Sequence, residues 1–325
     1  MMKKLLLAFN MLLAAFSIDA QVKWTNVDSL FQPLPLSVHV YFTNDSLDGK
    51  PNIAYYVSAE LKDRKLDFTV DTTLERRFTP TQYFERNGHP LVTVNCTFFE
   101  FNHSKNLNTV IKDGQLLGYN IHSIAGRGKD TFTYRHSFTS AIGIDRKRNA
   151  DVAWIYTDSA RRTAYASQHA LQSFSDSLQN RDFKKYVLTK QKDGNTTATF
   201  EKWKMQTAVG GGPALLQEGE VNISNEQELK FNGKAGLTDK HPRTCMGYTK
   251  DGKLIIMVIQ GRFPNKAEGA TLEQEARLLK QVGCWEALNL DGGGSSCMLV
   301  NGKQTITPSD KQGEQRAVPC VFMIK

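Results

Sequence analysis

Short apolar stretches that alternate with polar residues recur along most of this chain. A period of two is typical of strands that bury one face. Turn-forming pairs such as Asp113-Gly114, Asp251-Gly252 and Asn301-Gly302 separate neighbouring stretches and predict hairpins. We expect the stretches at 131–134 and 140–144 to pair with each other. The other expected strands and hairpins lie at 36–41, 54–57, 66–70, 91–94, 111–116, 151–156, 245–248, 254–259, 285–290, 298–300 and 318–324.

Three stretches predict helices instead. A short one is expected at 79–84, where Pro80 stands at a position that tolerates its missing N–H. The region 159–190 is rich in Ala, Gln, Ser and Arg and predicts one or two helices inserted into a mainly β chain. The clearest helix begins at Thr271, which forms a capping box with Gln274. We therefore predict an α+β fold with a mixed, mostly antiparallel β-sheet core and a few packed helices.

The N-terminus has the layout of a secretory signal peptide. Lys3 and Lys4 precede the apolar stretch 5–16, and the small residue Ala20 closes the segment. We expect cleavage after Ala20 and a periplasmic or secreted protein, since no later stretch approaches the length of a membrane span. The remainder is expected to form a β-rich region at 21–79, packed on a main domain at 80–325 that contains the insertion.

Composition and charge narrow the class of partner. The chain has 325 residues, of which 40% are hydrophobic and 23% charged, as in an ordinary globular protein. Its net charge is +8, but the basic residues are spread out, with short runs such as the one at 146–148. No Lys/Arg stripe is interleaved with aromatics, so we do not expect nucleic acid as a partner. An anionic glycan or phosphodiester would be attracted by this charge.

The cysteines do not suggest a metal site. Five are scattered along the chain, and none stands in a C-x-x-C pair, so zinc is not indicated. Most are flanked by apolar residues and are expected to be buried small side chains, although export would allow one pair to oxidise. We expect no metal and no cofactor.

The strand at 285–290 ends in a loop with the most distinctive chemistry of the chain. Asp291 is followed by three glycines and two serines. Consecutive glycines suit a backbone with positive φ or a close approach to another group. Their amides can form a nest for an anion, and serine hydroxyls add donors. A carboxylate beside such a nest fits phosphate or glycoside chemistry, and the alternative is a tight turn that Asp291 merely caps.

Two further polar residues stand at strand ends. Asn95 follows the strand 91–94 and either clamps a loop or binds a ligand, and we favour ligand binding. Arg243 precedes the strand 245–248, and its planar fork can hold a phosphate with two hydrogen bonds. The alternative for Arg243 is a structural ion pair. The glycine cluster 210–212 before Pro213 is interpreted as a backbone bend rather than a phosphate contact.

The motif Asn-Leu-Asp-Gly-Gly-Gly-Ser-Ser at 289–296 resembles the signature of the phosphodiester glycosidase family. Gly-Gly-Pro at 211–213, Pro-Arg-Thr at 242–244 and Pro-Ser-Asp at 308–310 resemble further elements of that family. Relatives usually have two glycines where this chain has Cys96-Thr97, so a phosphate role for the amides there is not expected. The resemblance is best over 206–325 and patchy over 80–156.

The resemblance implies a hydrolase that cleaves a sugar-1-phosphodiester at the glycosidic C–O bond in an exported glycan or glycoconjugate. Asp291 would be the catalytic carboxylate, Arg243 would hold the phosphate, and Asn95 would orient sugar hydroxyls. Candidates for a second carboxylate are Asp310, Glu314 and Glu100. The expected substrate-binding residues are Asn289, Gly292, Gly293, Gly294, Ser295, Ser296, Asp310, Glu314 and Arg316.

Two other functions fit the same loop. A non-catalytic envelope protein could use it to bind a glycan, and a phosphodiesterase that cuts P–O could use the same anion-binding groups. In each case the expected partner is a phosphorylated or phosphodiester-linked sugar.

Overall fold

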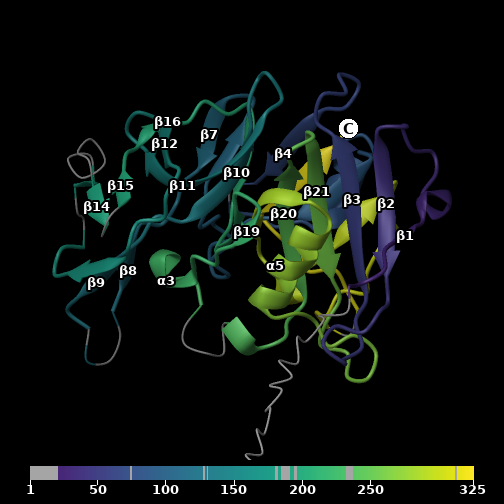
Figure 1. Ribbon diagram of the computed structural model, residues 1–325. Helices are drawn as coiled ribbons and strands as arrows, with labels where there is room; N and C mark the ends of the chain where they lie inside the picture. The colour runs from purple at the N-terminus through teal and green to yellow at the C-terminus, as the bar shows by residue number, and fades with distance from the viewer. Residues whose placement is uncertain are drawn as a thin grey trace, which may run out of the picture.

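Antiparallel β-sheets form the body of the structure, a computed structural model (Figure 1). The described residues are 21–73, 75–126, 129, 131–179, 182–183, 191–193, 196–231, 237–311 and 313–325, so the expected signal peptide lies outside them. The helices are short: α1 (Pro80–Arg86), α3 (Asn225–Glu228) and α5 (Leu272–Gln281). The predicted fold class, a mostly antiparallel core with a few helices, is confirmed.

The largest sheet has eight strands and brings together segments far apart in the sequence. Strands near the N-terminus pair with the strands that precede the Asp291 loop, so the β-rich region at 21–79 shares this sheet with the main domain. In spatial order the strands are β1 (Thr25–Asn26), β2 (Val38–Thr43), β3 (Ala54–Glu60), β21 (Lys253–Ile259), β20 (Arg243–Thr249), β22 (Cys284–Asn289), β18 (Ala214–Gln217) and β19 (Glu220–Val221).

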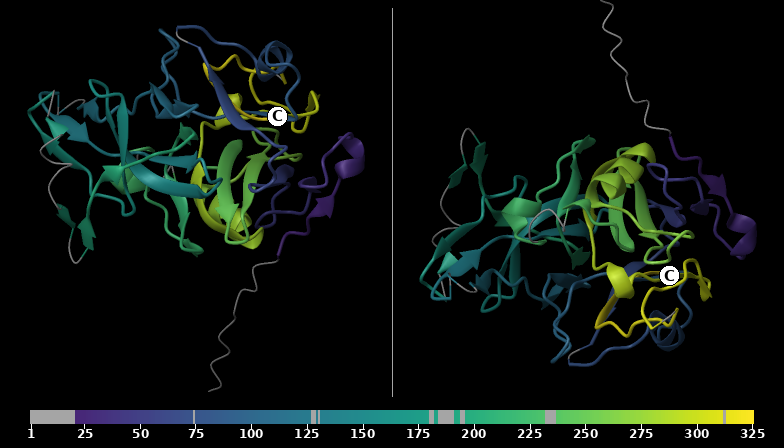
Figure 2. Two further views of the ribbon diagram at one scale, coloured as in Figure 1. Left: turned by 90° about the horizontal axis from the view of Figure 1, so that it is seen from above. Right: turned by 90° about the horizontal axis from the view of Figure 1, so that it is seen from below.

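Two further sheets complete the body. The seven-stranded sheet runs β16 (Glu201–Lys202), β12 (Thr163–Ser167), β11 (Ala150–Asp158), β10 (Ser140–Ile144), β17 (Thr207–Gly210), β6 (Val110–Lys112) and β7 (Gln115–Gly118). The five-stranded sheet runs β24 (Lys303–Gln304), β23 (Met298–Val300), β5 (Val92–Asn95), β25 (Cys320–Ile324) and β4 (Phe68–Thr72). Figure 2 shows these C-terminal strands beside the β4–β5 region.

Small sheets flank the body. One has three strands, β13 (Phe174–Asp176), β9 (Tyr134–His136) and β8 (Ser123–Ala125), and the other pairs β14 (Gln191–Asp193) with β15 (Thr196–Ala198). The expected pairing of 131–134 with 140–144 is therefore wrong. β9 pairs with β8 and β13, whereas β10 pairs with β11 and β17.

The three large sheets share one hydrophobic core. Val57 of β3, Val94 of β5 and Ile142 of β10 belong to the same buried cluster and are at most 2% exposed. Burying one such side chain stabilises the fold by about 1.5–3 kcal/mol. Because the sheets converge on this core, strand ends from different sheets can meet at one place.

The helix α5 follows the prediction closely. The Thr271 hydroxyl accepts the Gln274 amide at 3.1 Å, and the Gln274 side chain accepts the Thr271 amide at 2.9 Å, which completes the capping box. Its apolar stripe packs against β18 and β22, which fixes the strand that leads to Asp291. No helix in the described part of the chain is long and apolar enough to cross a membrane.

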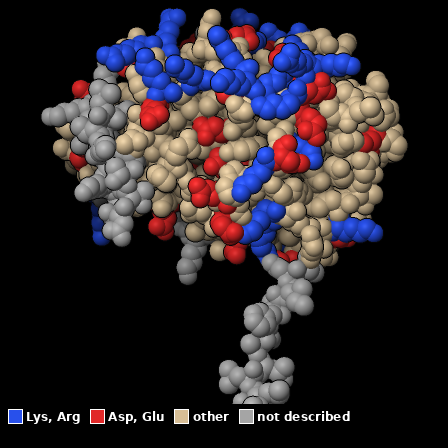
Figure 3. Space-filling view, turned by 45° about the horizontal axis from the view of Figure 1, so that its top comes forward, with Lys and Arg blue, Asp and Glu red and all other residues tan. Residues whose placement is uncertain are grey.

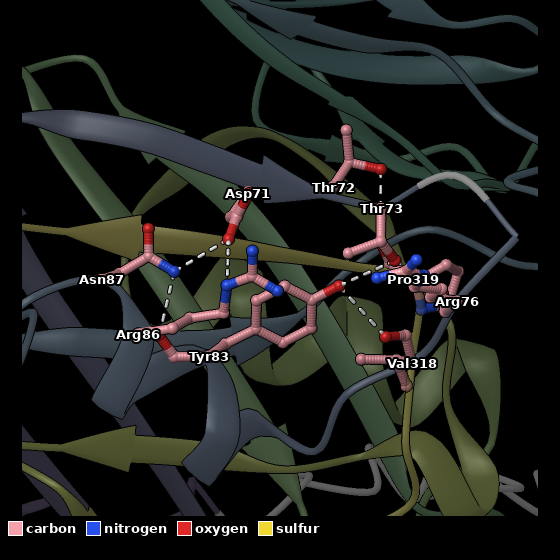
Figure 4. Close-up of polar contacts among 9 residues, drawn as sticks. All are labelled: Asp71, Thr72, Thr73, Arg76, Tyr83, Arg86, Asn87, Val318 and Pro319. Carbon is pink, nitrogen blue, oxygen red and sulfur yellow. Dashed lines mark hydrogen bonds and ion pairs between the residues drawn. The ribbon is translucent and has the colours of Figure 1, made fainter.

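The helix α1 is fastened to β4 and to the segment that precedes β25 by polar contacts (Figure 4). Asn87, which follows the helix, donates to the Asp71 carboxylate of β4 at 2.9 Å, and Arg86 lies 3.6 Å from the same group. The Tyr83 hydroxyl donates to the Val318 carbonyl at 3.2 Å. The helix expected at 79–84 is confirmed, with Thr79 as its N-cap.

The helical insertion expected at 159–190 is wrong over its described part. Thr163–Ser167 forms β12, which pairs with β11, and Phe174–Asp176 forms β13. The buried side chains of β12 alternate between two clusters, with Tyr165 in the main core and Ala164 and Ala166 in another. The alanines suggested a helix, but pairing along the long strand β11 overrides that local preference. Residues 180–181 and 184–190 lie outside the described residues.

Candidate active site

The ends of several strands meet around Asp291. Cys245 of β20 pairs with Asn289 of β22 in antiparallel register, which places the beginning of β20 beside the end of β22. The Leu290 amide donates to the Thr244 carbonyl at 2.8 Å and extends this pairing. From the five-stranded sheet, β5 ends at Asn95 against the same loop.

The backbone of Asp291 is held on both sides by the end of β5. Its amide donates to the Cys96 carbonyl at 2.8 Å, and its carbonyl accepts the Asn95 side-chain amide at 2.5 Å. The Asn95 side-chain oxygen in turn accepts the Thr244 hydroxyl and the Cys297 amide, each at 3.0 Å. Asn95 is completely buried. These contacts are those of the loop clamp that the sequence left as an alternative to ligand binding.

The glycines after Asp291 are required by close packing. Gly293 has φ of +61°, and its amide donates to the Pro242 carbonyl at 2.8 Å. A Cβ atom on Gly294 would lie 2.2 Å from Nη2 of Arg316, so only glycine lets this guanidinium approach the loop.

The short 3₁₀ turn Gly293–Ser295 uses most of the amides that were expected to hold an anion. The Ser295 and Ser296 amides donate to the carbonyls of Gly292 and Gly293 at 3.1 and 3.3 Å, and the Gly293 amide is occupied as described above. The nest of free amides inferred from the sequence therefore has fewer free donors, because the turn satisfies two of them internally and the Pro242 carbonyl accepts a third. The Ser296 hydroxyl is buried against the Thr244 hydroxyl at 3.1 Å.

The carboxyl group of Asp291 has a perturbed acidity. Burial raises its pKa to about 6, against the opposing effects of the Ser295 hydroxyl, Arg316 and Lys230. The Lys230 ammonium lies 4.1 Å from the centre of the Phe98 ring. Burial lowers the pKa of Lys230 to about 8, although Glu228 and Asp291 act in the opposite direction. Perturbed groups of this kind gather at functional sites.

Two arginines reach the loop from other elements. Arg316 donates from Nε to the Asp310 carboxylate at 2.8 Å and from Nη1 to the Ser295 hydroxyl at 3.4 Å. The hydrogen bond to Arg316 holds the pKa of Asp310 below its usual value. Arg262 is exposed, and its Nη2 lies 3.0 Å from where a Cβ of Gly293 would be. Lys230, Arg262 and Arg316 therefore supply positive charge around the Asp291 loop.

Arg243 lies in a different environment from these three cations. The residue is 3% exposed, and its side chain donates from Nε to the Ala270 carbonyl at 2.9 Å and from Nη2 to the Asp239 carbonyl at 3.3 Å. The Glu275 carboxylate is 3.9 Å from the Arg243 Nε, and burial raises the pKa of Glu275 to about 7. These contacts match the structural ion pair that was the alternative for Arg243.

Asn289 connects the loop to the second glycine cluster. Its side-chain amide donates to the Gly212 carbonyl at 2.8 Å, and its own carbonyl accepts the Gly212 amide at the same distance. Gly212 has φ of +108°, and a Cβ there would lie 2.1 Å from a Glu228 oxygen. The cluster is a backbone bend packed against Glu228, as expected. Glu314 is exposed on the loop that bears Asp310.

Sequence reasoning missed three charged groups near the loop. Arg262 lies three positions after the last residue of β21, and its place just beyond the end of a strand beside β20 was a usable signal. Lys230 and Glu228 stand in a stretch without a motif. The Glu228 carboxylate is completely enclosed and accepts from the Ser140 amide and hydroxyl, the Ala214 amide, the Trp154 indole and the Ser224 hydroxyl.

Sequence comparisons point to one family. The phosphodiester glycosidase model matches residues 171–325. An uncharacterized SPbeta prophage-derived protein of Bacillus subtilis, YomE, is 42% identical over 98 residues, which are 30% of this chain and 15% of that protein. The mouse N-acetylglucosamine-1-phosphodiester alpha-N-acetylglucosaminidase is 37% identical over 103 residues, which are 30% of this chain and 20% of the enzyme. The matches thus span a fifth or less of these relatives.

Solved structures share the fold over most of the chain. A hypothetical protein from Synechocystis has a TM-score of 0.57 at 16% identity and covers 94% of this chain and 68% of its own. The catalytic domain of the zebrafish N-acetylglucosamine-1-phosphodiester alpha-N-acetylglucosaminidase, auto-inhibited by its pro-peptide, also has a TM-score of 0.57, at 20% identity, and covers 90% of this chain and 84% of its own. The family match contains the whole Asp291 loop, and residues 171–325 of this chain are similar in sequence to the phosphodiester glycosidase family.

Proposed function

We propose that this protein hydrolyses the glycosidic C–O bond of a sugar-1-phosphodiester. The observation that carries the proposal is the Asp291 carboxyl group at a strand end. Hydrogen bonds fix both backbone groups of Asp291, Lys230 and Arg316 act electrostatically on its carboxylate, and Arg262 lies beside Gly293 of the same loop. A phosphodiester carries a negative charge beside the bond to be cut, so three cations around the loop that bears this carboxylate match its charge pattern.

In this reaction Asp291 acts as the base. Its carboxylate takes a proton from water, the water oxygen bonds to the anomeric carbon, and the C–O bond to the phosphate breaks. The electron pair of that bond leaves with the phosphate monoester, whose new charge is stabilised by Arg262, Arg316 and Lys230. A phosphate monoester is a good leaving group, so a second carboxylate is not needed to protonate it.

The raised pKa of Asp291 suits this role. A base is most effective when its pKa lies near the working pH, and a value of about 6 leaves most of the group ionised at neutral pH. It is also a stronger base than an ordinary aspartate. Arg316 is positioned by Asp310, and Asn95 fixes the backbone of Asp291, so both Asp310 and Asn95 act as positioning residues.

Oxygen-18 placement tests this function directly. The protein is incubated in H₂¹⁸O with the methyl phosphodiester of N-acetylglucosamine-1-phosphate, and the products are identified by mass. C–O cleavage places the label on the sugar and none on methyl phosphate. Label in the phosphate would reject the proposal in favour of a phosphodiesterase. Binding of the compound without turnover would favour the glycan-binding protein.

If the parent cleaves the C–O bond with Asp291 as the base, the Asp291→Asn variant should lose that activity. The matched control is Asp251→Asn, because Asp251 lies in the exposed turn between β20 and β21 at the other end of these strands. General base catalysis contributes about 10²–10⁴-fold, so the first variant should lose that much and the control should keep its activity. A folded Asp291→Asn protein with full activity would make Asp291 a turn residue.

We also propose that the protein is exported. The proposal rests on the basic, apolar and small-residue order of residues 1–20. The mass of the protein recovered from the periplasm or the medium should correspond to a chain that begins at Gln21. Recovery of the uncut chain from the cytoplasm would contradict export.

A further inference from the structure

Lysine and arginine side chains gather along one edge of the molecule (Figure 3). They come from turns that are distant in the sequence. Lys62, in the loop after β3, donates to the Lys147 carbonyl and to the Asn149 side chain, each at 2.8 Å, in the turn between β10 and β11. We call this edge the basic face. Its exposed members are Lys62, Arg146, Lys147, Arg162 and Lys204.

The basic face contains a cavity of about 610 Å³. Its rim carries Arg146, Lys147, Arg162 and Lys204, against one carboxylate, Asp145. That carboxylate is already hydrogen-bonded to the Asn149 amide at 2.8 Å and to its side chain at 2.9 Å. Four apolar side chains also line the cavity: Ile111, Leu116, Trp203 and Met205.

This lining fits a charged sugar. Among the residues that the structure describes, none of the four rim cations pairs with a carboxylate, so their charge faces the cavity and the solvent. A sugar ring offers an apolar face to side chains such as Trp203, and an anionic substituent would meet the rim. A flat basic surface for nucleic acid would not need the enclosed apolar part.

The basic face is remote from Asp291. The Leu61 amide donates to the Gly252 carbonyl at 2.9 Å, which places the loop bearing Lys62 at the β20–β21 turn. Asp291 lies at the opposite end of the strands β20 and β22. With a rise of about 3.3 Å per residue, the seven residues of β20 separate the two places by on the order of 20 Å.

We propose that the basic face binds a second anionic repeat of a polymeric substrate. The inference rests on the proposed function and narrows its substrate class to a glycan chain whose sugars are joined by phosphodiesters. One phosphodiester is held at Asp291 while another, several sugars along the chain, lies in the basic cavity. Occupying both places raises the affinity for long chains and leaves that for short substrates unchanged.

Binding is measured with a fluorescent oligomer of eight N-acetylglucosamine units joined by phosphodiesters, on the Asp291→Asn background so that the probe is not cut. Adding Lys147→Gln and Lys204→Gln should weaken binding about tenfold, because each exposed cation contributes a modest electrostatic attraction. The matched control adds Lys23→Gln and Lys303→Gln, which change the same charge at exposed lysines elsewhere. The control should bind the charged oligomer as tightly as its parent does. An uncharged oligomer of the same length should bind equally to the parent, the double variant and the control.

Turnover separates this inference from the proposed function. With Asp291 intact, Lys147→Gln/Lys204→Gln should raise KM for the octamer about tenfold and leave kcat/KM for the single-sugar phosphodiester unchanged. Equal octamer binding in the double variant and its control overturns the basic-face site, even if the short substrate is cleaved. Tighter binding of a DNA 20-mer or of phosphatidylglycerol vesicles, lost in the same double variant, also overturns it. Failure to cleave the short substrate refutes the function instead.

Discussion

Replacing Asp291 by asparagine should make the protein more stable at neutral pH while removing its activity. The native pKa of Asp291 is raised by burial from its ordinary 3.8 to about 6. Such a shift corresponds to about 3 kcal/mol of unfavourable free energy when the folded protein carries the charge. Asparagine keeps the shape and carries no charge. We expect Asp291→Asn to gain about 1–3 kcal/mol at pH 7, since part of the cost is relieved by relaxation around the charge.

The pH dependence identifies the cause of that gain. Because the native pKa is raised, the native state binds more protons than the unfolded chain between about pH 4 and pH 6. The parent therefore loses stability as the pH rises through this window, and the variant does not. The difference between them should be near zero at pH 4 and complete at pH 7.

Urea unfolding at pH 4, 5, 6 and 7 measures this difference directly, with Asp251→Asn as the control. The hydrogen bonds of Asp251 to Lys253 and Thr249 hold its pKa below the ordinary value. The control should therefore be less stable than the parent at neutral pH, the opposite sign. An Asp291→Asn protein that is less stable than the parent at pH 7, or whose gain does not change with pH, would refute the reasoning about this carboxylate.

Three other changes test the site. The kcat/KM of the parent should be about tenfold lower at pH 5 than at pH 7, because Asp291 must lose its proton to act as a base; a profile flat through pH 6 would contradict this role. Gly294→Ala should lower turnover about tenfold or more in a folded protein, since its Cβ would displace the Arg316 guanidinium; unchanged kinetics would show that Arg316 is not needed where it lies. Arg243→Lys should lower turnover of a phosphodiester sugar and a neutral aryl glycoside equally, if the latter is cleaved, because Arg243 is buried against Glu275; a selective loss on the phosphodiester would indicate direct phosphate contact.

Local patterns in the sequence predicted local structure well. The capping box of Thr271 and Gln274, the Asp113-Gly114 hairpin and the short helix after Thr79 depend on residues a few positions apart. The loop after Asp291 was found for the same reason, since its glycines and serines are consecutive. Signals of this kind are complete within one short segment.

Features that depend on distant segments were not predictable. The alanines at 164 and 166 suggested a helix, and only the pairing of β12 with β11 makes them a strand. Arg243 is buried because Glu275 of α5 and the Ala270 carbonyl lie beside it. The cations of the basic face are scattered in the sequence because they belong to different turns; Lys62 and Lys204 are 142 positions apart. The sheets bring these turns to one edge of the molecule.

The contacts that fix the Asp291 backbone determine which fragment of the chain could form the site on its own. The matched family segment begins at residue 171, yet the groups that fix the Asp291 backbone come from Asn95 and Cys96, and β21 pairs along its length with β3. A fragment trimmed to 171–325 would lack these partners and expose the edge of β21. The two halves, 21–158 and 163–325, would instead have to associate before the site is complete. If they are produced as separate chains, their hydrolytic activity should therefore measure how far they have associated.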